Sequence, residues 1–402
     1  MIKEVFENGV TLLYEYRNIS HSSFCIGLEA GANAEDEKSI GVAHALEHFL
    51  FKGTEKHGEE EINKKLDELF GFSNAMTNFP YVIYYGTTFN EDFEDAFNLY
   101  SDIVLKPSFT EDGFKEEISV IKQELSDWKG DLEQFCEDKL LYNSLLNERI
   151  GKRILGTEEH IEKITLEKMK KFHNNFYVSE NFVISVVASL DYDYVKELVL
   201  KNFGVLPKKA VQLKEEKKRI FKYGYYEDNK GLYKGAKIQI IFDISELTLD
   251  EVKGLKILNM YLGEGVSSLL YDEIRTKRGL AYEVKSEVKW EKGIRLFSIA
   301  ISTTKDSVNE AILAVENIIE NMNNLKLSKE EIKNLVKRYK MKSSLEIERS
   351  IVLANRMAIN EVLNGGGEIP IEDAEKDFKI SSKKINDIIK KVFKNKAIEV
   401  LM

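Results

Sequence analysis

Three residues in one short apolar segment have the types and spacing needed to bind a metal ion. His44 and His48 are four residues apart, and Glu47 lies between them. At about 100° per residue around a helix, Glu47 and His48 lie roughly −60° and +40° from His44, so all three side chains leave on one face. The surrounding residues 40–50 are almost all apolar, which predicts that this helix is buried.

Two buried imidazoles and a carboxylate need partners, because burial without them costs several kcal/mol. Imidazoles one helical turn apart can both reach a zinc ion at about 2.0–2.1 Å, and a third protein ligand leaves the fourth position for water. The order HxxEH is the inverzincin signature, the reverse of HExxH. A pair of core histidines held by ordinary hydrogen bonds is the alternative, but the third polar residue on the same face favours the metal.

A second predicted helix, at 111–127, offers two candidates for the third ligand. Glu117 and Glu124 are seven residues apart and therefore lie one above the other, on the shoulder of an apolar stripe. A carboxylate in that position needs a partner. Spacing alone does not rank the two, and a solvated shoulder is an equal alternative. The members of the stripe are Phe114, Ile118, Ile121 and Leu125.

The wider pattern predicts an α+β fold with two similar domains, which suits a length of 402 residues. We expect a zinc-binding domain at 1–208, a polar linker at 209–222 and a second, homologous domain at 223–402. Helices are expected at 40–51, 60–70, 91–105, 111–127, 249–261 and 267–277, and over most of 307–363. Strands are expected as a pair at 10–16 and 23–30, a hairpin within 73–89, and further strands at 181–188, 236–244, 282–290 and 294–303.

Composition excludes several classes of function. With 58 basic and 68 acidic residues the net charge is −10, so a nucleic acid is not an expected partner. No apolar run is long enough for a membrane span and the start does not resemble a signal peptide, so we expect a cytoplasmic protein without membrane contact. The two cysteines, Cys25 and Cys136, fit a reducing compartment.

Several motifs together resemble the insulinase (pitrilysin-type, M16) family of zinc peptidases, in particular its bacterial members that are similar to the mitochondrial processing peptidase. The likeness covers nearly the whole chain. It is carried by the segments Ala30–Ala32, His44–His48 with Phe51–Thr54, Asn74–Thr77, Glu117–Glu124 and Arg275–Tyr282.

This resemblance implies roles for the first group of residues. His44, His48 and Glu124 would bind one Zn²⁺ per chain, and Glu117 would support the site by orienting a ligand histidine. Glu47 would take a proton from zinc-bound water and deliver it to the departing amine.

Arg275 and Tyr282 would extend the site into the second domain. Their spacing alone fits a solvated helix end and an ordinary strand residue. The resemblance implies instead that they project over the zinc, where the phenol donates to the developing oxyanion and the guanidinium holds the substrate backbone.

Asn74 and Ala75 are the expected substrate contacts on an exposed edge strand. The resemblance implies that an extended peptide pairs with this strand by β-augmentation, whereas an ordinary hairpin is the alternative.

The expected function is a zinc metalloendopeptidase that cleaves extended peptides or unfolded segments. Full-size relatives hold four such domains, so the resemblance implies a homodimer or a heterodimer with a paralogue. Two alternatives remain open: a non-catalytic partner or scaffold subunit, and a protease that matures one dedicated precursor peptide.

Overall fold

The structure is a computed structural model that describes residues 1–402 except 129, 146–147, 214–219 and 230–233. The chain forms two compact units, and each is assembled from three segments. The first unit comprises Met1–Ser126, Arg153–Glu216 and Ser343–Glu375, and the second comprises Asp127–Lys152, Lys217–Lys342 and Lys376–Met402.

This division differs from the contiguous one expected from the sequence. Residues 127–152 belong to the second unit, and residues 343–375 belong to the first. Of the expected linker, residues 209–213 and 220–222 lie in no helix or strand. Its remaining residues, 214–219, lie outside the described part of the chain.

A six-stranded sheet forms the centre of the first unit, in the order β1-β2-β6-β3-β5-β4. The expected direct pairing of 10–16 with 23–30 is wrong, because β6 lies between those two strands. The sequence of β6 is entirely apolar apart from one serine and is buried throughout, so a partner on both edges suits it. The strands are β1 (Ile2–Val5), β2 (Thr11–Tyr16), β3 (His21–Leu28), β4 (Phe72–Thr77), β5 (Val82–Phe89) and β6 (Val183–Ala188).

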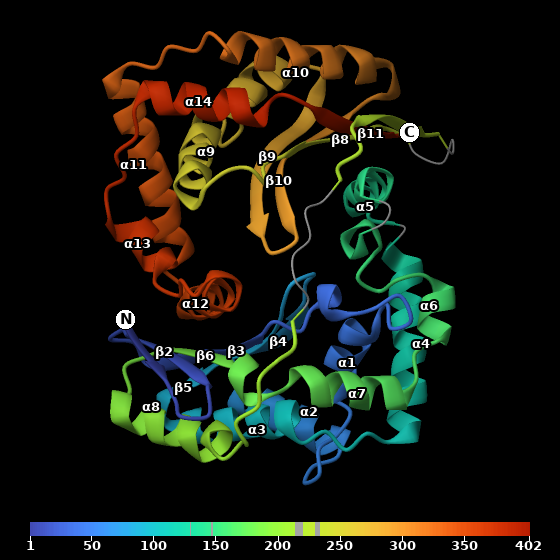
Figure 1. The fold of residues 1–402 in the computed structure, drawn as a ribbon, viewed down its shortest axis with the longest axis vertical. Helices are drawn as coiled ribbons and strands as arrows, with labels where there is room; N and C mark the ends of the chain where they lie inside the picture. Colours follow the sequence, from blue (N-terminus) through green and yellow to red (C-terminus); the bar gives the residue numbers. More distant parts are fainter. Residues whose placement is uncertain (129, 146–147, 214–219, 230–233) are drawn as a thin grey trace. The chain divides into compact units, whose positions relative to one another are not determined.

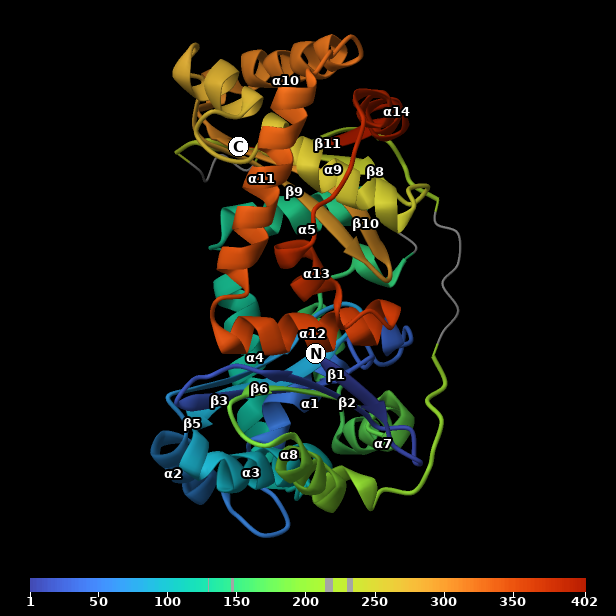
Figure 2. The same cartoon turned by 90° about the vertical axis from the view of Figure 1, so that its left-hand side faces the viewer.

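Helices cover both faces of this sheet, as Figures 1 and 2 show. On one face Phe24 of β3 meets Phe97 and Tyr100 edge to face. Its neighbour Cys25 points to the other face, into an apolar cluster with Met357, as the two-residue period of a strand requires. The first face carries α1 (Val42–Leu50), α2 (Glu59–Leu69), α3 (Phe93–Leu105) and α8 (Tyr192–Val199), and the second carries α12 (Ser350–Asn364).

Three further helices complete the first unit near the site. The predicted helix at 111–127 is confirmed as α4 (Glu111–Trp128), and α7 (Leu166–Phe176) packs against α1. The short helix α6 (Glu158–Glu162) is capped at its N-terminus by Thr157, whose hydroxyl accepts the backbone N–H of His160.

The second unit repeats the strand pairing of the first. Its five strands follow the order β7-β11-β8-β10-β9, and β7 is parallel to β11 as β2 is to β6. The predicted resemblance between the two halves is therefore confirmed. The strands are β7 (Gly224–Asp228), β8 (Ala236–Asp243), β9 (Ala281–Glu291), β10 (Ile294–Thr303) and β11 (Lys396–Leu401).

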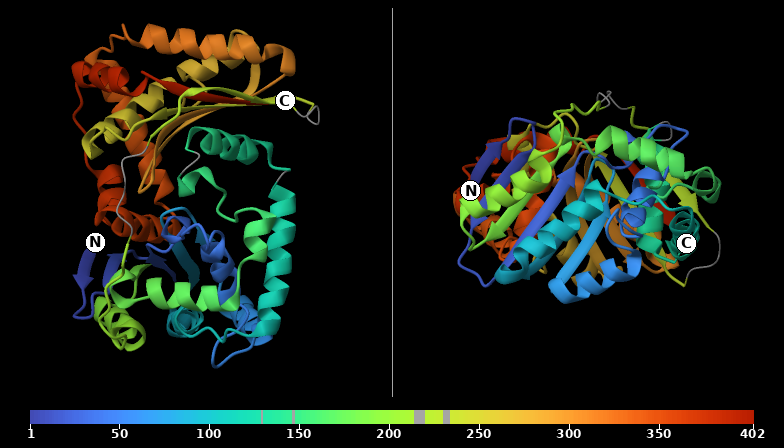
Figure 3. Two further views of the ribbon diagram at one scale, coloured as in Figure 1. Left: turned by 45° about the vertical axis from the view of Figure 1, so that its right-hand side comes forward. Right: turned by 90° about the horizontal axis from the view of Figure 1, so that it is seen from below.

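The helices of the second unit also follow the repeat. One face of the sheet carries α9 (Leu249–Leu262), α10 (Val308–Met322), α11 (Lys329–Glu346) and α14 (Ser382–Val392). The other face carries α5 (Leu132–Ser144), which comes from the N-terminal half of the chain (Figure 3). The short helix α13 (Ile369–Glu375) belongs to the first unit, like α12, and packs on it.

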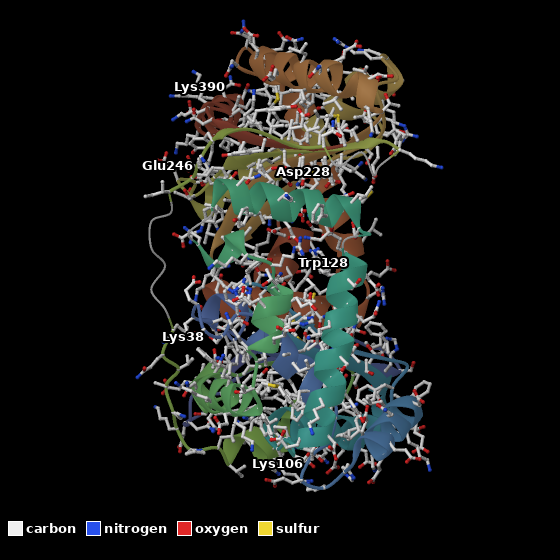
Figure 4. All side chains as sticks on the ribbon, turned by 90° about the vertical axis from the view of Figure 1, so that its right-hand side faces the viewer. Lys38, Lys106, Trp128, Asp228, Glu246 and Lys390 are labelled. Carbon is white, nitrogen blue, oxygen red and sulfur yellow. The ribbon has the colours of Figure 1, made fainter. Side chains whose placement is uncertain are left out.

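Helix α5 contacts its sheet largely through polar groups. Lys139 pairs with Asp228 at 2.8 Å, and Figure 4 shows Asp228 above this helix. Asn143 donates to the Glu399 carboxylate at 2.8 Å.

Among the described residues, no helix is long and apolar enough to cross a membrane.

Candidate metal centre

Helix α1 is held firmly at its N-terminus. Gly41 has a φ of 87°, a conformation that favours glycine, and a Cβ there would lie 2.8 Å from the carbonyl oxygen of Leu155. The Glu35 carboxylate accepts the backbone N–H groups of Gly41 and Ala43 at 3.1 and 2.8 Å. An acidic cap of this kind satisfies free N–H groups and stabilises the first turn.

The three predicted ligands converge. The rings of His44 and His48 lie 4.5 Å apart between centroids. Nε2 of His44 lies 3.7 Å from Oε1 of Glu124, and Nε2 of His48 lies 3.7 Å from its Oε2. Within the described residues these three side chains form the one group of three or more His, Cys, Asp or Glu placed to hold a metal ion.

The donor set fits zinc. A separation of 3.7 Å is too long for a hydrogen bond, but it is close to the roughly 3.3 Å between neighbouring ligands of a tetrahedral ion bound at about 2.0–2.1 Å. Oε2 of Glu124 is buried without a hydrogen-bond partner among the described residues. An ion among these atoms would satisfy that oxygen, so His44, His48 and Glu124 could together hold zinc.

Glu117 has a different partner. Its Oε1 lies 2.8 Å from Nδ1 of His48, the ring nitrogen that faces away from Glu124. A carboxylate in this position fixes the tautomer and the orientation of a ligand histidine. The structure thus separates two glutamates that helical spacing could not rank.

Glu47 is buried beside the cluster, and its carboxylate is not part of it. Its Oε2 accepts a hydrogen bond of 2.7 Å from the hydroxyl of Thr77, the last residue of β4. Burial raises the pKa of Glu47, and the hydrogen bond from Thr77 lowers it in part. Thr77 ends the motif Asn74–Thr77, but the sequence alone indicates no role for it.

Burial and neighbouring charges also act on the ligands. Burial, with a smaller contribution from the charge of His48, lowers the pKa of His44 to about 3. A neutral imidazole is the form that binds a metal. Burial lowers the pKa of His48, but Glu117 and the charge of Glu47 raise it further, so the net shift is upward. Burial raises the pKa of Glu124.

The predicted substrate residues lie at the sheet edge. Asn74 and Ala75 belong to β4, which among the described strands pairs with β5 alone. Oδ1 of Asn74 accepts the backbone N–H of Ala75 at 2.9 Å. The predicted edge strand is therefore confirmed, whereas its contact with a substrate stays a prediction.

Arg275 and Tyr282 belong to the second unit. Arg275 lies in the helical segment Tyr271–Thr276, with its guanidinium 4.8 Å from the ring centroid of Tyr271. Tyr282 is the second residue of β9, and its side chain is 61% exposed. Their action over the metal stays a prediction.

Comparison with known families places the chain. The family model described as insulinase (peptidase family M16) matches residues 11–158, and the one described as peptidase M16 inactive domain matches residues 163–339. The chain belongs to the insulinase family of peptidases, M16. The metal cluster of this M16 protein lies within α1 and α4, and most of the second unit falls in the range of the inactive-domain model.

Relatives and solved structures agree with the M16 assignment. An uncharacterized zinc protease of Rickettsia bellii is 28% identical over 86% of this chain and 83% of its own length. The uncharacterized zinc protease YmxG of Bacillus subtilis is 24% identical over 96% and 94%. The crystal structure of a protease from Helicobacter pylori has the same fold, with a TM-score of 0.87 at 20% identity over 100% of this chain and 99% of that one.

Proposed function

We propose that the chain is a zinc metalloendopeptidase that hydrolyses peptide bonds in extended peptides or unfolded segments in the cytoplasm. One observation carries the proposal. Two imidazole nitrogens converge with the Glu124 carboxylate, while Glu47, on the same helical turn, is held by Thr77 outside the ligand set. A metal site with a separate buried acid beside it suits hydrolysis better than a structural role.

The side chains of the site have separate roles in the proposed reaction. When bound, zinc would polarise the peptide carbonyl and lower the pKa of a water molecule. Glu47 takes the proton that the attacking water loses and passes it to the departing amine nitrogen. Its raised pKa suits a group that must both accept and release a proton. Glu117 keeps the His48 ring in its orientation through the Nδ1 contact.

Substrate recognition is proposed to use the backbone. The outer edge of β4, at Asn74 and Ala75, would pair with an extended peptide strand and select conformation more than side-chain identity. Arg275 and Tyr282 would complete the site from the second unit, the former by holding the substrate and the latter by donating to the oxyanion. We further propose that two copies, or this chain and a paralogue, form a dimer, which light scattering during gel filtration would measure.

Zinc content and peptide cleavage test the proposal together. The purified wild type is expected to hold about one zinc per chain and to cut a mixed peptide library, with products read by mass spectrometry. Glu47→Gln is expected to keep the zinc and lose cleavage, and His48→Ala to lose both. A wild type that neither binds zinc nor cleaves would indicate a non-catalytic partner subunit. Cleavage confined to a single sequence would indicate maturation of one precursor.

A further inference from the structure

A hydrogen bond at one residue joins helix α1, which carries His44 and His48, to the edge strand β4. The hydroxyl of Thr77 donates to Oε2 of Glu47 at 2.7 Å. Both side chains are buried. The Thr77 hydroxyl contacts Glu47, which lies outside the cluster of His44, His48 and Glu124.

The unpaired edge of β4 ends at the residue that makes this hydrogen bond, Thr77. In an antiparallel edge strand, every second residue turns its backbone groups away from the neighbouring strand. At Ala75 the N–H is taken by the Asn74 side chain, and Thr77, two residues further along the strand, donates its hydroxyl to Glu47. A peptide that pairs with this edge must displace the Asn74 oxygen, and it then lies next to Glu47.

We propose that Thr77 is a positioning residue that couples the pairing of a peptide with β4 to the placement of the Glu47 carboxylate. This inference rests on the proposed peptidase function. An edge strand becomes an internal strand when a peptide pairs with it, so its end moves less. The Thr77 hydroxyl is then fixed, and with it one oxygen of Glu47. Binding energy from a remote part of the substrate would thus raise kcat.

The second unit contains a comparable hydrogen bond between its edge strand and its first helix. The Ser286 hydroxyl of β9 donates to Oδ1 of Asn259 in α9 at 2.5 Å. In the repeat, α9 and β9 correspond to α1 and β4. A hydrogen bond from edge strand to first helix therefore belongs to the architecture of both units, and only in the first unit is its acceptor the carboxylate beside the metal cluster.

Two substitutions at Thr77 distinguish the effect of its hydroxyl donor from the effect of its side-chain shape. Thr77→Val keeps the branched side chain and removes the donor, whereas Thr77→Ser keeps the donor. Thr88→Val is the matched control, because Thr88 is a buried threonine on the adjacent strand β5 whose hydroxyl donates to the carbonyl of Leu69 at 2.6 Å. Zinc content, thermal melting, KM and kcat are measured for each protein, with a short peptide and with an extended version of it.

In the wild type, extension of the peptide is expected to raise kcat. In Thr77→Val, zinc content and KM are expected to stay within about twofold while kcat for the extended peptide falls about 10- to 100-fold, the range for a lost hydrogen bond to a charged group. The gain in kcat from extension should disappear. Thr77→Ser should recover most of kcat, and Thr88→Val should keep it.

Three results would overturn the inference. They are an unchanged kcat in Thr77→Val, a kcat in Thr77→Ser as low as in Thr77→Val, or a loss in Thr88→Val of the same size. If Thr77→Val does not fold, Thr77→Ala supplies the same comparison. A wild type without zinc or cleavage would instead contradict the proposed function itself, and the wild-type measurement alone reveals that case.

Discussion

Oε1 of Glu117 lies 2.8 Å from Nδ1 of His48. Glu124, two turns further along α4, approaches the other nitrogen of the same ring, Nε2, at 3.7 Å. One imidazole therefore lies between two carboxylates of a single helix, hydrogen-bonded to the first and separated from the second by the distance that an ion would bridge. These two contacts assign the glutamates different tasks, and the tasks can be tested separately.

Removal of the Glu117 carboxylate should weaken metal binding without abolishing it. Glu117→Ala is expected to lower zinc affinity about 10- to 100-fold, because the His48 ring loses the group that orients it. Competition with a chelator of known affinity measures this. Glu116→Gln is the control, since the neighbouring Glu116 is exposed and pairs with Lys52 at 3.0 Å. Equal affinities in both variants would contradict the role of Glu117.

Replacement of Tyr282 tests whether the second unit takes part in the reaction. Tyr282→Phe is expected to lower kcat about 10²- to 10³-fold, as loss of an oxyanion donor does, with zinc content unchanged. Because the side chain is 61% exposed, the melting temperature should not change. Tyr16→Phe, at a residue 60% exposed on β2, should leave kcat unchanged. An unaffected kcat in Tyr282→Phe would exclude the phenol from the reaction.

Helix α12 should contribute strongly to the stability of the first unit. Leu353 is fully buried between this helix and the sheet, so Leu353→Ala is expected to lower the free energy of unfolding by about 2–5 kcal/mol. Leu345→Ala, at a side chain 63% exposed, should change it by less than about 0.5 kcal/mol. Urea denaturation measures both. Similar values for the two variants would mean that α12 is not packed on the sheet.

Stability should fall with rising pH because of Glu291 in the second unit. Burial raises the pKa of Glu291 to about 7, although the charge of Lys289 lowers it in part. A carboxyl with a raised pKa in the folded state stabilises that state below its unfolded pKa, and this contribution is lost as pH rises through the folded value. Glu291→Gln should therefore be more stable than the wild type at pH 8.

The gain in Glu291→Gln is expected to be about 1–3 kcal/mol at pH 8 relative to pH 5, after allowance for partial solvent exposure. Urea denaturation at the two pH values measures it. Glu283→Gln is the control, because Glu283 lies on the same strand with its side chain 50% exposed. Parallel pH profiles for Glu291→Gln and the wild type would contradict the prediction.

Local geometry explains what the sequence could predict. The common face of His44, Glu47 and His48 depends only on the helical period, and the structure confirms it. Glu117 and Glu124 differ by seven residues, about 700° of rotation, so they point in nearly the same direction. Their separate contacts depend on how α4 lies along α1, which no local pattern contains.

Long-range placement explains what the sequence could not predict. Apolar stripes indicate that α12 buries one face, but not that it packs on the sheet of the first unit. Helix α5 contacts its sheet through polar residues, such as Asn143 with Glu399. In the sequence these residue types are the same as those of a solvated helix, so they do not indicate the contact. Thr77 is a common strand residue, and its partner Glu47 lies 30 residues earlier in the chain.

Anomalous diffraction at the zinc absorption edge, from crystals of the zinc-loaded protein, tests the central claim most directly. We expect one peak per chain, within about 2.0–2.2 Å of Nε2 of His44, Nε2 of His48 and a carboxylate oxygen of Glu124. The same peak should persist in Glu47→Gln. A peak elsewhere, or none at these three atoms when zinc is in excess, would contradict the account.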